Sequence, residues 1–202
     1  EEAESVGNIL KFNKNKVPKA AQELHRPIDN IPRLLSEIKS FNENLFICCL
    51  LTYSLLLRPH REVRCLTKGD FNSDFSQLNL SGDRVKSKRN RIIPIPSTVQ
   101  LELHRRYTDL NKIDNLFTGT TDLFHQDYFK GLWSKFKKQS ESLEPNQTLY
   151  SFRHTGAIKV FEKTGSLLKL QQVMGHSDMK VSLTYLRGLE VKQLDVEDLP
   201  EL

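Results

Sequence analysis

The residues best suited to chemistry lie in three separated places along this chain of 202 residues. Arg58 directly follows a long apolar segment and precedes a proline, which disfavours helical geometry in the residue before it. The segment 84–91 holds five lysine or arginine residues among its eight positions. The segment 149–186 contains an arginine, a histidine and a tyrosine: Arg153, His176 and Tyr185. Cations at this density suit contact with the phosphates of a nucleic acid.

Each of these features also has a purely structural explanation. Arg58 fits a surface arginine at a helix end, and a basic hairpin can be basic because its tip is solvated. A tyrosine in a helix usually packs against its neighbours, although Tyr185 lies in a polar frame. We expect His154 to support the preceding arginine rather than to react.

Histidine and cysteine spacing predicts neither a metal nor a cofactor. The other histidines have no mutual spacing typical of a metal site; they are His25, His60, His104 and His125. The three cysteines form no C-x-x-C pair, which argues against a disulfide scaffold or a thiolate zinc site. Cys48 and Cys49 lie in an apolar run, as expected of buried thiols in a reducing compartment.

Apolar spacing predicts the helices that position these residues. They cover residues 31–40, 41–57, 59–66, 97–107, 125–139, 151–164, 166–174 and 178–186. Gly165 and Gly175 are expected to stop helices, and serines to cap their starts. Short segments around a Ser-Gly-Asp turn predict antiparallel strands at 78–80, 84–86 and 91–95. The expected fold class is mainly α with a small antiparallel β-sheet (α+β).

Charge and hydropathy allow a polyanionic partner and exclude a membrane span. The net charge is +5, but the last 13 residues hold five acids and one lysine, so residues 1–189 carry +9. The uncharged run 45–57 has 13 residues, whereas a bilayer requires about 20. We therefore expect a buried helix and no membrane partner.

The order and spacing of these features resemble the catalytic domain of the tyrosine recombinase (phage integrase) family over residues 31–187. Members carry an arginine after the first long buried helix, and a hairpin lysine five residues before an arginine that leads an apolar-apolar-Pro strand. An H-x-x-R-H motif, a Gly-His pair and a tyrosine nine residues after that histidine follow. The matching positions are Arg58, Lys86, Arg91 with Ile92-Ile93-Pro94, Tyr150 to His154, Gly175-His176 and Tyr185. The resemblance implies the tyrosine recombinase catalytic-domain fold.

Two positions depart from the family's pattern. Tyr150 replaces the first histidine, and we expect its hydroxyl to tune activity because it can still donate or accept a hydrogen bond. The usual R-x-x-E motif is one residue longer here, from Arg58 to Glu62. Either Glu62 supports Arg58 across a different turn, or the register is looser and Arg61 competes for the active position. We prefer Arg58 because the proline break orients it.

The resemblance also implies a mechanism, in which Tyr185 attacks DNA without a metal and forms a 3′-phosphotyrosine. Arg58 and Arg153 would stabilise the charge that develops on the phosphate. Lys86 would act as general acid for the departing 5′ oxygen, and His176 would bind the phosphate or assist proton transfer from the tyrosine. The residues expected to bind DNA are Arg84, Lys88, Arg89 and Arg91.

The same resemblance implies three parts and a set of partners. Residues 1–30 would be a linker or arm from an N-terminal DNA-binding domain, 31–188 the catalytic domain, and 189–202 a tail that either packs on a neighbouring protomer or frays. Expected partners are double-stranded recombination sites, a homo-tetramer on DNA and accessory DNA-bending proteins, in the bacterial cytoplasm and associated with the nucleoid. A catalytically degenerate DNA-binding protein and a type IB topoisomerase-like relaxation activity are the alternatives.

Overall fold

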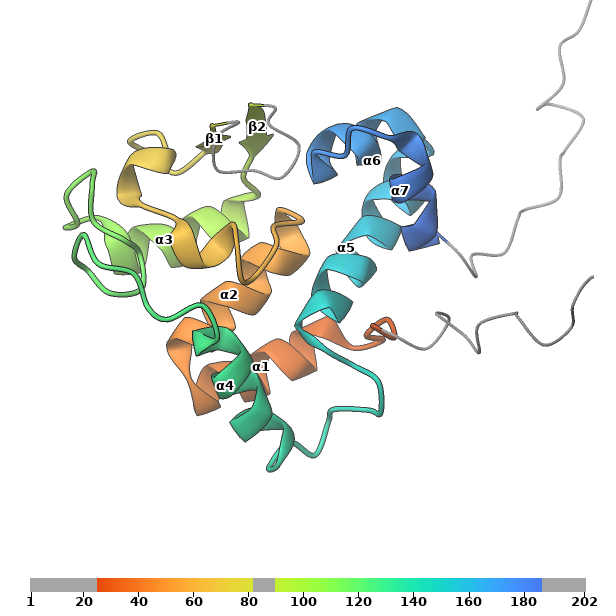
Figure 1. Ribbon diagram of the computed structural model, residues 1–202, viewed down its shortest axis with the longest axis horizontal. Helices are drawn as coiled ribbons and strands as arrows, with labels where there is room; N and C mark the ends of the chain where they lie inside the picture. The colour runs from red at the N-terminus through yellow and green to blue at the C-terminus, as the bar shows by residue number, and fades with distance from the viewer. Residues whose placement is uncertain (1–24, 82–89, 187–202) are drawn as a thin grey trace, which may run out of the picture.

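The structure, a computed structural model, describes residues 25–81 and 90–186. Its helices, shown in Figure 1, are α1 (Ile31–Phe41), α2 (Glu43–Ser54), α3 (Ser97–Tyr107), α4 (Tyr128–Lys137), α5 (Leu149–Thr164), α6 (Leu167–Met174) and α7 (Met179–Leu183). The 3₁₀ turns are η3 (Val63–Cys65), η4 (Lys68–Asp70) and η6 (Thr184–Leu186), and the strands are β1 (Gln77–Leu80) and β2 (Arg91–Pro94). The predicted mainly α architecture with a small antiparallel sheet is confirmed.

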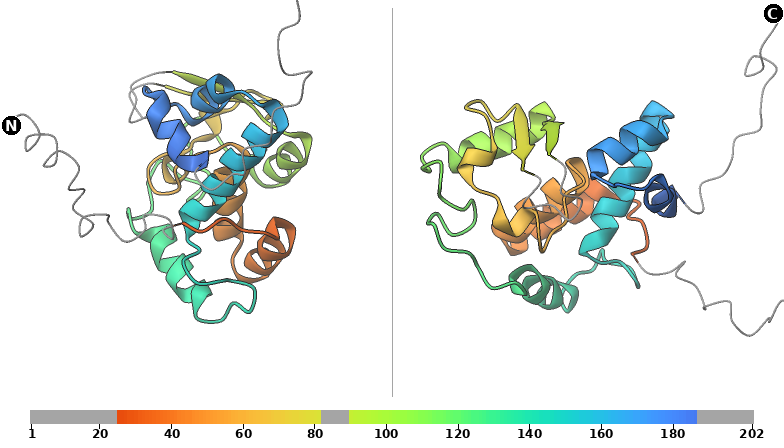
Figure 2. Two further views of the ribbon diagram at one scale, coloured as in Figure 1. Left: turned by 90° about the vertical axis from the view of Figure 1, so that its right-hand side faces the viewer. Right: turned by 45° about the horizontal axis from the view of Figure 1, so that its top comes forward.

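Helices α2 and α5 pack against each other at the centre of the molecule (Figures 1 and 2). Helix α2 is buried on nearly every side, as its apolar composition requires. A Cβ atom at Gly156 of α5 would lie 2.2 Å from the carbonyl oxygen of Tyr53 in α2, so only glycine permits this approach. The contact fixes α5, which carries Arg153, beside the end of α2, which leads to Arg58.

The helix predicted over residues 41–57 is shorter at both ends. Asn42 has an extended backbone and separates α1 from α2. It caps α2, because its side chain accepts a hydrogen bond from the backbone N–H of Leu45 at 2.9 Å. Helix α2 ends at Ser54, and Leu56 adopts a left-handed conformation with φ of 53°. The apolar run continues beyond the helix because Leu56 packs into a second cluster beneath α6, whereas its two neighbours face the main core.

The segment after α2 forms turns rather than the helix predicted over residues 59–66. Only η3 is helical there. The backbone N–H groups of Glu62 and Val63 donate to the carbonyl oxygen of Arg58 at 2.9 and 3.0 Å. This compact turn brings Glu62 back over Arg58.

The sheet consists of β1 and β2 in antiparallel register, with Leu80 opposite Arg91 and Gln77 opposite Pro94. Helix α3 follows directly and matches the predicted range 97–107, whereas α4 is shorter at both ends than predicted. The strand predicted at 84–86 lies outside the described residues, as do the predicted arm up to residue 24 and the predicted tail.

The C-terminal helices surround the second, smaller cluster. Gly165 and Gly175 end α5 and α6 in the left-handed conformation, with φ of 61° and 67°, which confirms both predicted helix stops. Ser166 caps α6 through its side chain, as predicted, whereas α5 starts at Leu149 after the cap Thr148 and not at the predicted residue 151. Helix α7 has only five residues, so Tyr185 lies in the turn η6 instead of the predicted helix. No helix within the described ranges combines the length and hydropathy that a bilayer crossing requires.

Candidate active site

Arg58 lies in the turn after α2, where Glu62 holds it. The backbone N–H of Arg58 donates to Oε2 of Glu62 at 2.9 Å, and its Nη1 donates to Oε1 at 2.7 Å. Burial alone would raise the pKa of Glu62, but Arg91 and the N–H and charge of Arg58 outweigh burial and lower it. Glu62 therefore remains a carboxylate beneath Arg58. Arg61, the competing arginine, is exposed instead.

Arg153 is completely buried in α5 and donates in three directions. Its Nη2 donates to the carbonyl oxygen of Met174 at 3.2 Å and to Nε2 of His176 at 3.4 Å, and its Nε donates to the hydroxyl of Tyr185 at 3.4 Å. Nη1 is buried and has no acceptor within the described part of the chain. Because an unsatisfied buried donor costs about 1–3 kcal/mol, a further acceptor would be favourable here.

His176 follows the glycine that ends α6, and its hydrogen bonds determine where its proton lies. Since arginine only donates, Nε2 of His176 accepts from Arg153. The proton is then on Nδ1, which donates to the hydroxyl oxygen of Ser182 at 3.0 Å. Burial, together with Arg153 and Arg58, lowers the pKa of His176 to about 4, so the ring is neutral at neutral pH.

Tyr185 is half-buried on η6, among the rings and cations just described. Its ring centre lies 5.6 Å from that of His176 and 5.8 Å from that of His154. The guanidinium carbon of Arg153 is also 5.8 Å from the Tyr185 ring centre. The structure thus brings together four residues that are far apart in the sequence: Arg58, Arg153, His176 and Tyr185.

Arg91 differs from its expected place among the DNA contacts of the hairpin. It is only 4 % exposed, and its Nη2 donates to Oε2 of Glu62 at 3.2 Å. Its Nη1 donates to the carbonyl oxygen of Met174 at 2.8 Å, the same oxygen that accepts from Arg153. Arg91 is therefore turned inward by a buried carboxylate and a carbonyl, and it ties β2 to the site.

Gly175 allows Arg91 to take this place. A Cβ atom at Gly175 would lie 2.6 Å from Cδ and 2.8 Å from Nη1 of Arg91. The residue also has φ of 67°, which glycine adopts without strain. Both the backbone and the neighbouring guanidinium therefore require a glycine directly before His176.

Tyr150, which replaces the first histidine of the H-x-x-R-H motif that the sequence resembles, lies near two imidazole rings. Its ring centre is 5.2 Å from that of His25 and 6.1 Å from that of His60. Burial raises the pKa of Tyr150, so its hydroxyl remains protonated and neutral. The position thus offers a hydroxyl group next to the cationic cluster rather than an imidazole.

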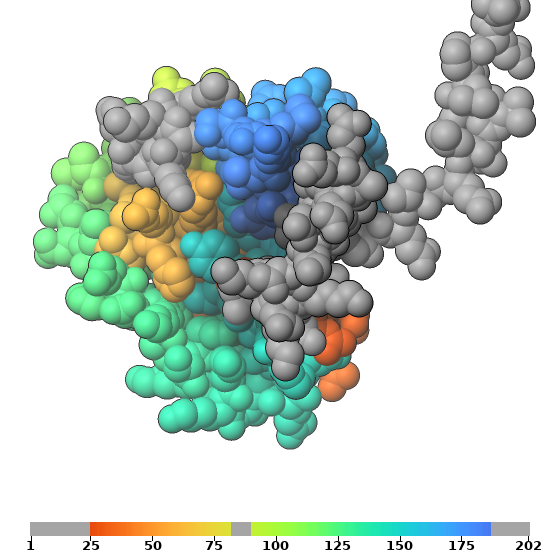
Figure 3. Space-filling model, turned by 45° about the vertical axis from the view of Figure 1, so that its right-hand side comes forward, coloured from red at the N-terminus to blue at the C-terminus, as the bar shows by residue number. Residues whose placement is uncertain are grey.

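Among the described residues the cluster has a net positive charge, because three guanidinium groups (Arg58, Arg91 and Arg153) lie around the one carboxylate of Glu62. A hollow of about 230 Å³ opens beside it between β2 and α6, and its lining includes Arg91 and His176. Figure 3 shows α6 and α7 in blue beside α5 and the segment after α2 on this face. Four expected site residues lie outside the described residues: Arg84, Lys86, Lys88 and Arg89.

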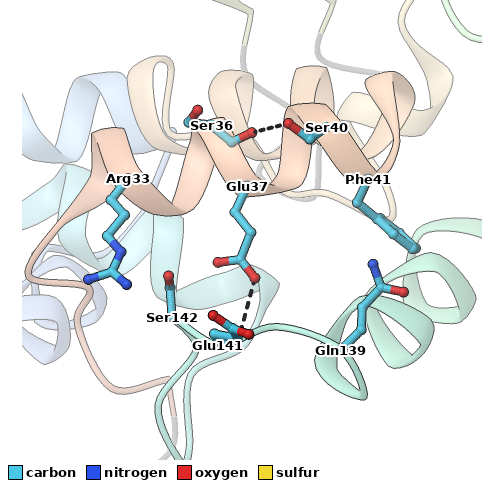
Figure 4. A pocket seen from close by; sticks show the side chains of 8 residues that line it. All are labelled: Arg33, Ser36, Glu37, Ser40, Phe41, Gln139, Glu141 and Ser142. Atoms are coloured by element: carbon cyan, nitrogen blue, oxygen red, sulfur yellow. Dashed lines mark hydrogen bonds between the residues drawn. The ribbon is translucent and has the colours of Figure 1, made fainter.

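A larger hollow, of about 600 Å³, lies between α1 and the segment after α4 (Figure 4). Its lining combines Arg33 with the carboxylates Glu37 and Glu141. Glu37 accepts a hydrogen bond from the backbone N–H of Glu141 at 3.1 Å. Because its carboxylates outnumber its cation, this hollow does not suit phosphate. Among the described residues no group of histidine, cysteine and carboxylate side chains is arranged to hold a metal ion.

Sequence reasoning missed two contacts of this site. The inward turn of Arg91 depends on Glu62, 29 positions away, and on a backbone carbonyl. His154 contacts the carbonyl oxygen of Tyr185, not the neighbouring arginine as expected. A backbone carbonyl that accepts a hydrogen bond leaves no signal in the sequence. Only the glycine of the Gly-His pair indicated that another group lies close to the backbone in this region.

Relatives of known type match most of the chain. The sequence model of the phage integrase family matches residues 27–191. The tyrosine recombinase XerA of Thermococcus kodakarensis is 24% identical over 196 residues, covering 91% of this chain and 68% of the relative. XerA of Thermococcus onnurineus is 27% identical over 202 residues, with 95% and 70% covered. A putative integrase of Pseudomonas phage Pf1 is 26% identical over 159 residues, with 78% and 43% covered.

Solved structures share the fold. The integrase of transposon Tn1549, in complex with transposon right end DNA, has a TM-score of 0.63 at 20% identity, covering 89% of this chain and 65% of that one. A XerA recombinase has a TM-score of 0.59 at 20% identity, with 90% and 63% covered. The catalytic domain of bacteriophage HP1 integrase has a TM-score of 0.55 at 21% identity, with 80% and 87% covered. The predicted catalytic-domain fold is confirmed.

Proposed function

This chain belongs to the phage integrase family of tyrosine recombinases, and we propose that it cleaves and rejoins DNA strands through a covalent bond to Tyr185. One observation carries the proposal. Tyr185 and His176 both contact Arg153, whose buried Nη1 has no acceptor among the described residues. A non-bridging oxygen of a DNA phosphate is the kind of acceptor that a guanidinium binds best.

In the proposed reaction the phenolic oxygen of Tyr185 attacks the phosphorus of one strand. The bond between phosphorus and the 5′ oxygen breaks, the phenol loses its proton, and the 5′ oxygen gains one. The products are a 3′-phosphotyrosine and a free 5′-hydroxyl, so the energy of the phosphodiester is retained and no nucleotide is consumed. Attack by the 5′-hydroxyl of a second strand reverses the step and completes the exchange.

The cations act on the charge that accumulates in the transition state. Arg58 is held by Glu62 and Arg153 by α5, so neither has to reorganise when charge appears on the phosphate. Removal of one such preorganised donor typically slows a reaction about 100- to 1,000-fold. Lys86 is the proposed proton donor to the 5′ oxygen, on the family resemblance alone.

His176 is suited to the proton of the phenol because it is neutral. Its Nδ1 donates to Ser182, which leaves the lone pair of Nε2 as the acceptor. When a phosphate oxygen takes over the bond from Arg153, Nε2 becomes free to accept the proton of Tyr185 and, once it carries that proton, to donate to the phosphate. Integrases that exchange strands act on two duplexes, and we propose a homo-tetramer on paired sites as the assembly.

The test is covalent capture of DNA. The full-length protein is incubated with duplexes that carry a nick next to a randomised sequence, so that the cleaved strand escapes and the adduct accumulates. We expect an adduct with the unmodified protein and none with Tyr185→Phe. The control is Tyr128→Phe, which removes a hydroxyl on α4 that accepts from Asn44. DNA binding without an adduct, or an adduct that survives Tyr185→Phe, would contradict the proposal.

A further inference from the structure

His154, the residue after Arg153, contacts the nucleophile through the backbone. Its Nε2 lies 2.8 Å from the carbonyl oxygen of Tyr185, and its Nδ1 lies 3.0 Å from the carbonyl oxygen of His25. A carbonyl oxygen only accepts hydrogen bonds, so each ring nitrogen must donate. A neutral imidazole carries a single N–H. The two bonds therefore coexist only in the imidazolium form of His154.

The His25 end of this bridge is firmly anchored. Residues 25–28, here called the strap, run along the start of α5. The strap makes these bonds: Nδ1 of His25 to the Thr148 hydroxyl at 2.6 Å, Arg26 N–H to the Asn146 carbonyl at 3.0 Å, Gln147 Nε2 to the Pro27 carbonyl at 3.0 Å, and Ile28 N–H to the Thr155 hydroxyl at 2.9 Å.

The backbone of His25 is itself unusual. Its φ is 66°, a left-handed value that is uncommon outside glycine. Such a conformation persists where surrounding contacts over-determine it, and it often accompanies a functional contact. Here it accompanies the hydrogen bond between the His25 carbonyl and His154.

At the Tyr185 end, the other support comes from side-chain packing, because Tyr185 and Leu186 pack against the second cluster and the Tyr185 ring lies 5.6 Å from that of His176. Tyr185 lies on a three-residue 3₁₀ turn after the five-residue helix α7. The contact of its hydroxyl with Nε of Arg153 is longer, at 3.4 Å. Since a displacement of about 1 Å can slow a reaction about 100-fold, the backbone anchor of this turn matters for attack on a phosphate.

We propose that protonated His154 is a positioning residue that clamps the backbone of the nucleophile Tyr185 to the strap. The inference rests on the proposed function and assigns His154 no contact with the reacting atoms. Deprotonation of His154 removes one of the two bonds and releases Tyr185 from the strap. The clamp thereby makes the placement of the nucleophile depend on pH and on the strap.

The surroundings of His154 are compatible with a cation. Among the described residues, the titratable groups that interact with it include the His25 ring on the strap and the Tyr185 phenol on η6, and the Arg153 guanidinium precedes it on its own helix. Burial, and then the charge of His154, lower the pKa of His25. His25 therefore stays neutral beside a charged His154, and the two rings do not repel each other as cations.

A pH titration followed by NMR tests the clamp without DNA. We expect the backbone signals of Tyr185 and Leu186 to shift with the same midpoint as the His154 ring, and to lose this shift in His154→Gln. The matched control is His104→Gln on α3, where a ring nitrogen also bonds a carbonyl, that of Asp74, at 2.9 Å. That variant should leave the titration of Tyr185 unchanged. Tyr185 signals that do not follow His154 would overturn the proposal.

Kinetics of adduct formation test its consequence. We expect His154→Phe to lower the rate of adduct formation at saturating DNA about 10- to 100-fold, with unchanged DNA affinity. His154→Gln keeps one donor, so its rate should lie between that of His154→Phe and that of the unmodified protein. A variant at the unmodified rate, or one that loses affinity and rate equally, would contradict the clamp. If the unmodified protein forms no adduct, the proposed function fails while the titration still decides the clamp. If His154→Phe does not fold, His154→Gln and the titration decide.

Discussion

His176 links the electrostatics of the site to the stability of the protein. Burial and the neighbouring arginines lower its pKa to about 4, whereas an unfolded chain has a histidine pKa of about 6.5. Between these values the unfolded state binds more protons, so the free energy of unfolding falls as the pH falls. We expect a loss on the order of 2 kcal/mol between pH 7 and pH 5, measured by urea unfolding.

The variant His176→Gln isolates this effect, because its side chain does not titrate. It should lose the part of the decrease between pH 7 and pH 5 that His176 contributes and keep the part from His25 and His60, whose pKa values burial also lowers. His125→Gln, at an exposed histidine, should keep the whole decrease. An equal pH dependence in His176→Gln and the unmodified protein would show that other groups dominate. A phosphate analogue such as sulfate should lessen the decrease, because a bound anion offsets the arginines that repel a proton from His176.

The ends of α5 and α6 provide a matched pair of glycines. Gly165 and Gly175 are both left-handed, but a Cβ atom at Gly165 would meet nothing within 4 Å, whereas one at Gly175 would collide with Arg91. We expect Gly165→Ala to lose about 1 kcal/mol of stability and to keep its rate of adduct formation. Gly175→Ala should lose more stability and slow adduct formation at least about 10-fold, because Arg91 and His176 are displaced.

Thermal unfolding and adduct kinetics, measured on both glycine variants, separate the two causes. If Gly175→Ala reacts as fast as Gly165→Ala, the close packing of Arg91 under Gly175 is not required for catalysis. If both variants react slowly, adduct formation requires a left-handed glycine at each helix end, and the contact between Gly175 and Arg91 has no separate role.

Sequence reasoning predicted well those helices whose extent or end is marked by residue type. The predictions for α1 and α3 succeeded because one side of each helix is apolar, and α5 and α6 end at glycines. The end of α2 was missed because an apolar run looks the same in a buried helix and in a segment shared by two cores. Arg91 was misplaced because its basic neighbours suggested a solvated hairpin, while its carboxylate partner Glu62 is distant in sequence.

The charge of the whole molecule leads to a prediction about DNA affinity. Residues 1–189 carry +9, and the segment 84–91 has the highest density of cations. Each phosphate contact releases counterions, so affinity falls with salt in proportion to the number of contacts. We expect the double variant Lys88→Gln and Arg89→Gln to bind duplexes of any sequence more weakly and to reduce the salt slope by about one per lost contact.

A matched double variant separates local contact from net charge. Lys135→Gln and Lys137→Gln remove the same charge from exposed positions on α4, at the end of the molecule away from β1 and β2 (Figure 1). If the segment 84–91 touches phosphate, the α4 variant keeps nearly the full salt slope, measured by fluorescence anisotropy from about 50 to 200 mM salt. Equal slopes in the two variants would mean that DNA responds to the overall charge, or that α4 also faces the duplex. The affinity of Tyr185→Phe should equal that of the unmodified protein at every salt concentration, because the proposed role of the hydroxyl is in the reaction and the hydroxyl contributes no cation.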